Sequence, residues 1–212
     1  MILRKFALVA ALVSMASGAQ AVTLDIVGGQ LMGASDVLVD GDLYSVQFLD
    51  GTCSEVYNGC DSASDFTFQT LAAATLASSA LSDQVLVNTG TSGEDFDSVP
   101  SLTNGCFSPT TCSIFTLYKA LPSDPDHEFD ASRFINNPSG DSIGSVLGVG
   151  PPGYDWSGQS QATFAVWSVA PEPAPVPALQ LPGIALLVAS LLGVGAGSLR
   201  RQRRASPRPG LI

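Results

Sequence analysis

Positive charge is scarce in most of this sequence. Seven of the nine lysine and arginine residues lie near the two ends of the chain. Between Asp25 and Glu172 only Lys119 and Arg133 remain, and two cations against nineteen carboxylates give this region a net charge of −17. Such a surface repels phosphate backbones and anionic lipid head groups, which argues against nucleic-acid binding. It suits divalent cations, and it also keeps an exported protein soluble.

Some residue patterns that mark common enzymes are also missing. The sequence contains no H-E-x-x-H, and the glycine-rich stretch 148–153 has two prolines, which lack the amide donors that a phosphate-binding loop needs. The single histidine, His127, has acidic neighbours and is expected in an exposed loop. The carboxylates are spread over turns and do not single out a glycosidase pair. We therefore predict no catalytic residues and a protein that is not an enzyme.

Two kinds of binding remain as hypotheses. Calcium favours oxygen ligands at alternate positions, although no segment here follows the twelve-residue calcium loop, so we expect weak calcium binding at most and no other cofactor. The acidic clusters that motivate it are Asp36, Asp40 and Asp42, then Glu94, Asp95 and Asp97, then Asp124, Asp126, Glu128 and Asp130. Tyr154, Trp156 and Trp167 could stack on a sugar ring, although such aromatic residues more often pack in the core.

The first 21 residues have the features of a secretory signal peptide. Arg4 and Lys5 precede an apolar segment, 6–13, and small residues end in Ala19-Gln20-Ala21, the A-x-A pattern read by signal peptidase. The alternative, a short amphipathic helix, is disfavoured because the apolar residues have no period of 3.6 and no acidic residue precedes Asp25. We expect export, with cleavage after Ala21.

Residues 22–169 suffice for one extracellular domain with a hydrophobic core. Alternating apolar residues and turn signals such as Asp40-Gly41 predict a β-rich α+β fold, either one sheet or a sandwich, with a single long helix. The strands are expected at 23–27, 36–39, 43–49, 112–120, 143–149 and 161–169, the helix at 65–88, and polar or turn-rich segments at 89–101 and 122–140.

Side-chain periodicity predicts which faces are buried. In the strand 43–49, Tyr44, Val46 and Phe48 share one face, which should point into the core. The predicted helix, capped by Asp65 or Thr67, has a stripe of apolar residues that should also be core rather than a partner-binding surface. That stripe comprises Phe68, Leu71, Ala74, Leu81 and Val85.

The four cysteines are expected to form disulfides. An even number of cysteines in an exported chain favours bridges, and four allow three connectivities. Local pairing of Cys53 with Cys60 and of Cys106 with Cys112 is preferred, because each pair flanks a turn-rich loop. The alternative, a four-cysteine zinc site, is disfavoured because structural zinc sites usually space paired cysteines two to four residues apart.

The C-terminal region divides into three parts. A proline-rich linker spans 170–182, an apolar stretch spans 183–199, and a basic tail spans 200–212. As a helix the apolar stretch would be about 26 Å long, close to a hydrocarbon core of about 30 Å. The arginines beyond it would stay in the cytoplasm and place the domain outside. A single-span anchor in the inner membrane is the simplest physical interpretation.

The same residues resemble a bacterial sorting signal. Their pattern is similar to the PEP-CTERM class of exosortase-sorted surface proteins of Gram-negative bacteria, and especially to its VPLPA-CTERM variant. Pro171-Glu172-Pro173 reproduces the name-giving triplet, and the segment 176–182 is a looser version of V-P-L-P-A. The triplet lies farther from the apolar stretch than the class pattern has it, and residues 205–212 extend beyond the arginines. The matching positions are Pro171, Glu172, Pro173, Val176, Pro177, Pro182, Arg200, Arg201, Arg203 and Arg204.

Membership of this class would imply a route rather than a reaction. It implies export, transient residence in the inner membrane, processing by an exosortase, and delivery to the cell surface or to an exopolysaccharide matrix. Our first hypothesis is accordingly a non-enzymatic surface or matrix protein. The second is an extracellular hydrolase or a carbohydrate- or calcium-binding module held by a plain membrane anchor.

Overall fold

The computed structural model of the chain describes residues 21–171. Apart from Ala21 and Pro171, the predicted signal peptide, sorting signal, membrane span and basic tail lie outside these residues. The strands are β1 (Thr23–Val27), β2 (Gln30–Val39), β3 (Asp42–Leu49), β4 (Cys112–Ala120), β5 (Phe129–Asn136), β6 (Ser142–Val149) and β7 (Ala162–Val169). The helices are α1 (Cys53–Val56) and α2 (Leu71–Ala80), which continues into a π turn, η3 (Leu81–Val85). Short 3₁₀ turns are η2 (Ala63–Asp65), η4 (Pro100–Leu102) and η5 (Trp156–Gly158).

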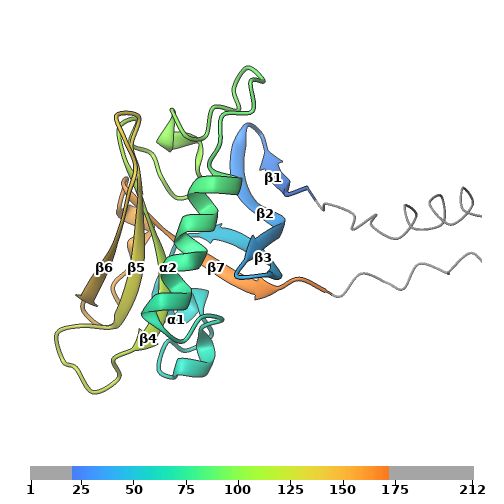
Figure 1. Ribbon diagram of the computed structural model, residues 1–212. Coiled ribbons are helices and arrows are strands. Elements are labelled where there is room, and N and C mark those ends of the chain that lie inside the picture. Colours follow the sequence, from blue (N-terminus) through green and yellow to red (C-terminus); the bar gives the residue numbers. More distant parts are fainter. Residues whose placement is uncertain (1–20, 172–212) are drawn as a thin grey trace, which may run out of the picture. The chain divides into compact units, whose positions relative to one another are not determined.

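All seven described strands form one mixed sheet in the order β1-β2-β3-β7-β4-β5-β6 (Figure 1). Two antiparallel meanders, β1 to β3 and β4 to β6, lie at the two ends of this order. The last strand, β7, lies between them and pairs antiparallel with β3 and parallel with β4. The predicted β-rich fold is confirmed, and of the two expected forms it is the single sheet.

The two faces of the sheet carry separate cores. One core contains Val46, Ile114 and Phe134 together with the buried side of α2. The other contains Phe115 and Phe164 together with the α1 segment. Neighbouring residues on a strand point to opposite faces, so the two helices cover opposite faces of the sheet. Because α2 contacts β2 as well as β4, β5 and β6, the sheet curves around it (Figure 1).

Several predicted details are confirmed. Val46 and Phe48 are fully buried, and Tyr44 packs against the same core. Asp40 and Gly41 both have positive φ, as a tight hairpin between β2 and β3 requires. Within residues 21–171 no helix is long and apolar enough to cross a membrane, and the predicted span 183–199 lies outside this range.

The predicted helix 65–88 is wrong in its extent. Helix α2 begins only after Thr70, whose hydroxyl accepts a hydrogen bond from the amide of Ala73. Phe68 therefore precedes the helix, although its ring is buried as expected, and Leu71 is 37% exposed. Of the predicted stripe, Ala74, Leu81 and Val85 are fully buried as expected. The other buried residues of α2 are small, and they let the helix approach the strands closely; they are Ala77, Ser78 and Ala80.

The segment 122–140 was predicted to be polar and turn-rich, but it contains the buried strand β5. Several of its polar side chains find partners inside the domain, which offsets part of the cost of burying them, although Asn136 Oδ1 has no partner. Ser132 accepts a hydrogen bond from Ser78 of α2 at 2.9 Å, and the side-chain amide of Asn136 donates to the carbonyl of Phe96 at 2.7 Å. Strand β2 is also longer than the predicted 36–39, since it begins at Gln30.

The predicted local disulfides are present. Cys53 pairs with Cys60 and Cys106 with Cys112, with Cα–Cα distances of 5.6 and 5.7 Å. The first bridge lies in the core that contains Phe115, and the second in the core that contains Ile114. Because the pairs belong to opposite faces of the sheet, the alternative four-cysteine zinc site is not formed.

Replacing Phe164 by alanine should test the core on the α1 side. Phe164 is fully buried, and its ring lies 5.7 Å from Phe129 and 5.8 Å from Tyr57, measured between ring centroids. We expect Phe164→Ala to lower the free energy of unfolding by about 3–5 kcal/mol in urea denaturation. The matched control is Phe107→Ala, because Phe107 is 61% exposed and should change stability by less than about 0.5 kcal/mol. Equal losses for both variants would contradict the assigned core.

Candidate functional site

Within residues 21–171, five buried polar side-chain atoms have no hydrogen-bond partner, and three of them belong to residues at the end of β3, at the start of β5 and in η5. Asp50 Oδ1, Glu128 Oε2 and Trp156 Nε1 are buried without a hydrogen-bond partner. The Cys53–Cys60 bridge lies beside Glu128, and Asp155 lies beside Asp50. We call this group the disulfide cluster; its members are Asp50, Cys53, Cys60, Glu128, Asp155 and Trp156.

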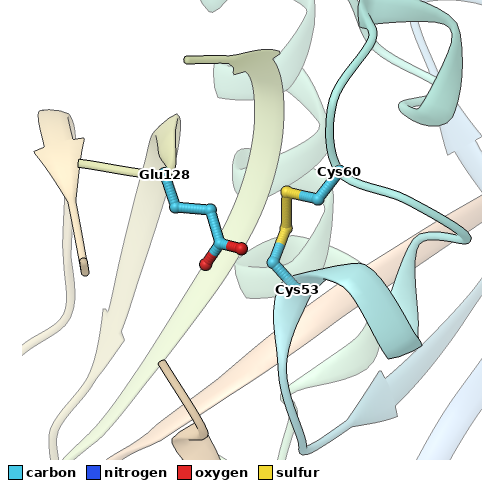
Figure 2. Close-up of side chains that lie close together, drawn as sticks. All are labelled: Cys53, Cys60 and Glu128. Atoms are coloured by element: carbon cyan, nitrogen blue, oxygen red, sulfur yellow. A yellow bond between two sulfur atoms is a disulfide. The ribbon is translucent and has the colours of Figure 1, made fainter. Parts of the chain in front are cut away.

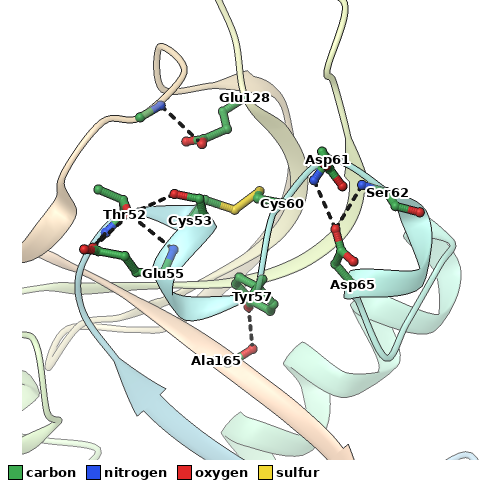
Figure 3. The surroundings of a disulfide bond; sticks show 12 residues. Thr52, Cys53, Glu55, Tyr57, Cys60, Asp61, Ser62, Asp65, Glu128 and Ala165 are labelled. Carbon is green, nitrogen blue, oxygen red and sulfur yellow. Dashed lines mark hydrogen bonds between the residues drawn. A yellow bond between two sulfur atoms is a disulfide. The ribbon is translucent and has the colours of Figure 1, made fainter.

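Local capping positions the first half of the disulfide cluster (Figure 3). The hydroxyl of Thr52 accepts from the amide of Glu55 at 3.3 Å, and the Glu55 carboxylate accepts from the amide of Thr52 at 3.2 Å. This reciprocal capping box starts α1 at Cys53. The chain then turns through Gly59 to Cys60, which has a φ of 56°, and closes the bridge. The position of the disulfide is therefore fixed on its N-terminal side by hydrogen bonds between side chains and backbone amides.

Tyr57 connects the turn that follows α1 to the sheet. Its hydroxyl donates to the carbonyl of Ala165 in β7 at 3.1 Å (Figure 3). Its ring lies edge-on to Phe66 and Phe164. Burial raises the pKa of the phenol, which therefore stays neutral. The α1 segment is thus held against β7 by one buried hydrogen bond and by aromatic packing.

The carboxyl group of Glu128 points at the disulfide (Figure 2). A carboxyl oxygen of Glu128 and the two sulfur atoms lie within 4.8 Å of one another. Oε1 accepts from the amide of Gly153 at 3.3 Å, whereas Oε2 has no partner. Burial raises the pKa of Glu128. Since the cysteines are bonded to each other, they offer no thiolate, and the group is not a metal site in this oxidised form.

Asp50 and Asp155 form the second half of the disulfide cluster. Burial, and secondarily the charge of Asp155, raises the pKa of Asp50 to about 6. Hydrogen bonding from Ser157, whose amide donates to Asp155 at 2.9 Å, holds the pKa of Asp155 below its usual range. Gly105 passes directly over Asp50, since a Cβ at this position would lie 2.6 Å from Thr163 Oγ1 and 3.1 Å from Asp50 Cγ. Asp50 is thus confined between backbone and a second carboxylate.

Of the aromatic residues predicted as a sugar platform, Tyr154 and Trp156 lie together, whereas Trp167 lies on the other face of the sheet. Trp156 packs on Phe115 and Phe129 of the α1-side core, and Tyr154 lies edge-on to it at 5.1 Å. Trp167 is 6% exposed and belongs to the core on the other face, where its indole nitrogen donates to Thr116 at 3.2 Å. Trp167 is therefore a core residue.

His127 lies in the loop before β5, as predicted. Its side chain is 45% exposed and Nδ1 lies 3.1 Å from Asp124 Oδ2. The other Asp124 oxygen accepts from the amides of Asp126 and His127 at 2.9 and 3.1 Å. These hydrogen bonds hold the pKa of Asp124 below its usual range. The pair stabilises the loop.

The acidic clusters predicted as calcium ligands are used for local structure. Asp36 and Asp40 have positive φ in a strand irregularity and a turn. Asp130 forms an ion pair with Lys119 at 3.2 Å and accepts from the amide of Gly148 at 2.9 Å. Within residues 21–171, none of the three clusters brings three carboxylates within ligand distance of one another. The calcium hypothesis thus gains no support from their arrangement.

Two surface hollows of the described domain lie away from the disulfide cluster. One of about 360 Å³ lies over β1, β2 and β3 and is lined by residues such as Thr23, Asp25 and Gln47. Another of about 520 Å³ is formed by the loop Ala120–Pro125. Neither hollow is lined by Glu128, Asp50 or His127, so the buried carboxyl groups do not face these spaces.

Comparisons of the chain with protein-family models, with curated proteins and with solved structures find no match. Function must therefore be argued from the chain itself. The disulfide cluster combines one predicted feature, the bridge, with contacts that the sequence did not indicate. Glu128 lies in the segment predicted as a polar loop, far along the chain from Cys53, and nothing in its spacing signals this contact.

The raised pKa of Asp50 predicts a pH dependence of stability. Folding raises this pKa from an ordinary 3.8 to about 6, so the folded state binds the proton more tightly than the unfolded chain does. The contribution of Asp50 to stability therefore falls as the pH rises from about 4 to about 6, and it stays low above that. We expect Asp50→Asn to have a larger free energy of unfolding, compared with the wild type at the same pH, at pH 7 than at pH 4. Urea denaturation at the two pH values measures this difference.

Asp155→Asn provides the matched comparison for Asp50→Asn. It removes the charge of Asp155, which is the secondary cause of the raised pKa of Asp50, and it retains a side-chain oxygen that can accept a hydrogen bond from the amide of Ser157. We expect a change in the same direction but smaller. Identical pH dependence of stability in the wild type and Asp50→Asn would contradict the buried environment of Asp50 beside the like charge of Asp155.

Proposed function

We propose that this chain is an exported surface or exopolysaccharide-matrix protein of a Gram-negative bacterium, sorted and processed at its C-terminus by an exosortase. The observation that carries the proposal is the order of segments along the chain. An A-x-A signal precedes the domain, and Pro171-Glu172-Pro173, an apolar stretch and an arginine cluster follow it. The compact unit that contains the sheet ends at Ala170, directly before that triplet.

The domain has properties expected of an extracellular protein. Each of its two disulfides closes a short loop, and such bridges persist in oxidising compartments. The net charge of −17 between Asp25 and Glu172 keeps copies soluble. The carboxyl groups with raised pKa, Asp50 and Glu128, lie in structural surroundings next to the core and the bridge. We accordingly assign the domain no enzymatic activity.

Cleavage at both ends is the direct test of this proposal. In a host that carries an exosortase, the mature protein should begin at Val22 and lack residues 183–212, as intact mass spectrometry of the surface or medium fraction would show. Without the exosortase the same chain should stay in the membrane fraction with its C-terminus intact. Replacing the triplet Pro171-Glu172-Pro173 by alanines should have the same effect as loss of the enzyme.

The matched control replaces Pro151 and Pro152 by alanines, because they are exposed prolines within the folded domain and outside the sorting segment. Processing of this control should be unchanged. An uncleaved C-terminus in the presence of the exosortase would reject processing and would leave a plain membrane anchor.

A further inference from the structure

Glu128 is buried beside the Cys53–Cys60 bridge without the partners that a buried carboxyl group normally has. Its side chain accepts one hydrogen bond, from the amide of Gly153 to Oε1, and Oε2 accepts none. Neither of the two ion pairs within residues 21–171 includes Glu128, so it also has no cation beside it. Such burial is costly unless some form of the molecule supplies the missing partner.

The reduced form of the neighbouring bridge supplies that partner. A carboxyl oxygen of Glu128 and both sulfur atoms lie within 4.8 Å of one another, and the carboxyl group points at the bridge (Figure 2). A disulfide has no hydrogen to donate, whereas each thiol of a reduced pair has one S–H donor. Opening the bridge therefore places a proton donor beside the unpartnered carboxyl oxygen.

Backbone hydrogen bonds hold Glu128 in this position. Its amide donates to the carbonyls of Val149 and Gly150 at 3.2 and 2.8 Å, and its carbonyl accepts from the amide of Leu121 at 2.9 Å. The carboxyl group thus reaches the bridge from a point fixed at the start of β5. Because Glu128 and the cysteines are far apart in sequence, their contact exists only in the folded domain.

The two bridges of the domain differ in accessibility and in backbone conformation. Cys60 is 5% exposed and lies between two exposed residues, whereas Cys53, Cys106 and Cys112 are fully buried. Cys60 also has a φ of 56°, in the left-handed region that is unfavourable for a residue with a side chain, and neither Cys106 nor Cys112 has a positive φ. An external thiol therefore meets Cys60 before any other cysteine, and opening this bridge frees Cys60 from a strained conformation.

We propose that Cys53, Cys60 and Glu128 form a thiol–disulfide exchange site in which Glu128 holds the exchanged proton. When the bridge opens, an external thiolate attacks Sγ of Cys60, the bond to Cys53 breaks, and the Cys53 sulfur takes a proton from the carboxyl group of Glu128. A second external thiol then releases Cys60 as a thiol, and Glu128 regains its proton from water. In sum, two external thiols become one disulfide while the bridge becomes two thiols.

Closure of the bridge is the reverse reaction and uses an external disulfide as the oxidant. Cys60 first forms a mixed disulfide with it and releases one external thiol. The Cys53 sulfur then gives its proton to Glu128 and attacks Sγ of Cys60, which releases the second external thiol. The exchange concerns a bridge of the chain itself, so it does not depend on how the C-terminus is processed.

The burial of Cys53 makes a proton donor necessary. A thiolate released at Cys53 would be a fully buried anion, which its surroundings disfavour. Burial also raises the pKa of Glu128 and thereby favours the protonated carboxyl group that can donate. Within the described domain, no acidic group lies in the same way beside both Cys106 and Cys112. The second bridge is therefore an internal reference for the first.

Comparison of the two bridges within one molecule tests the proposal. The full-length chain, exported from a Gram-negative host, is treated with dithiothreitol in the presence of a metal chelator, and free thiols are alkylated at successive times. Cleavage before aspartates such as Asp83 and Asp97 places the two bridges on separate peptides for mass spectrometry. In the wild type, Cys53–Cys60 should be reduced faster than Cys106–Cys112.

Variants of Glu128 test its role as the proton donor. Glu128→Gln should slow the reduction of Cys53–Cys60 at least about tenfold, because the amide has no acidic proton to give, and should leave Cys106–Cys112 unchanged. Glu128→Asp should retain part of the rate, because a carboxyl group remains. If Glu128 only packed against the bridge, Glu128→Gln would loosen its surroundings and accelerate reduction instead.

Asp130→Asn is the matched control, because Asp130 is also a buried carboxyl group but pairs with Lys119 instead of facing the bridge. Both bridges should be reduced in it as in the wild type, and urea denaturation verifies that each variant is folded. Equal rates for the two bridges in the wild type would overturn the proposal. Reduction of Cys53–Cys60 that Glu128→Gln leaves unchanged or accelerates, equal slowing of both bridges in this variant, or the same slowing in Asp130→Asn would overturn it as well.

Discussion

The structure depends on the insertion of its last strand into the middle of the sheet. β7 forms hydrogen-bonded ladders with β3 on one side and with β4 on the other, and it is the link between the two antiparallel meanders. Its alternating residues also supply both cores, because Phe164 points to the α1 side and Trp167 to the α2 side. The pairing of β7 joins residues far apart in sequence, so the complete sheet cannot form until residues 162–169 are available.

The position of β7 is compatible with the proposed processing of the C-terminus. The strand ends at Val169, two residues before the triplet Pro171-Glu172-Pro173, so cleavage beyond the triplet would leave the sheet intact. The bridges close loops on the two faces, Cys53–Cys60 under α1 and Cys106–Cys112 directly before β4. Together with the high negative charge, these features fit the exported, non-enzymatic domain that we propose.

Local sequence features predicted most elements, whereas long-range contacts escaped them. The strand 112–120, the hairpin at Asp40-Gly41 and both disulfides are visible in alternation, turn residues and spacing. β5 was missed because the strand period was masked by polar residues, whose burial depends on partners elsewhere, such as Ser78 for Ser132. The approach of Glu128 to the disulfide could not be predicted for the same reason, since it requires the sheet order, which no local pattern encodes.

β7 completes the domain, and the domain ends where the proposed sorting segment begins. Paired truncations, ending at Ser160 and at Ala170, test it most directly, with near-ultraviolet circular dichroism and resistance to protease as the measurements. The chain that ends at Ala170 should be folded and protected, because β7 is complete. The chain that ends at Ser160 should lose both signals, because β3 and β4 have no shared partner. Protection and near-ultraviolet signals retained in the shorter chain would contradict the account.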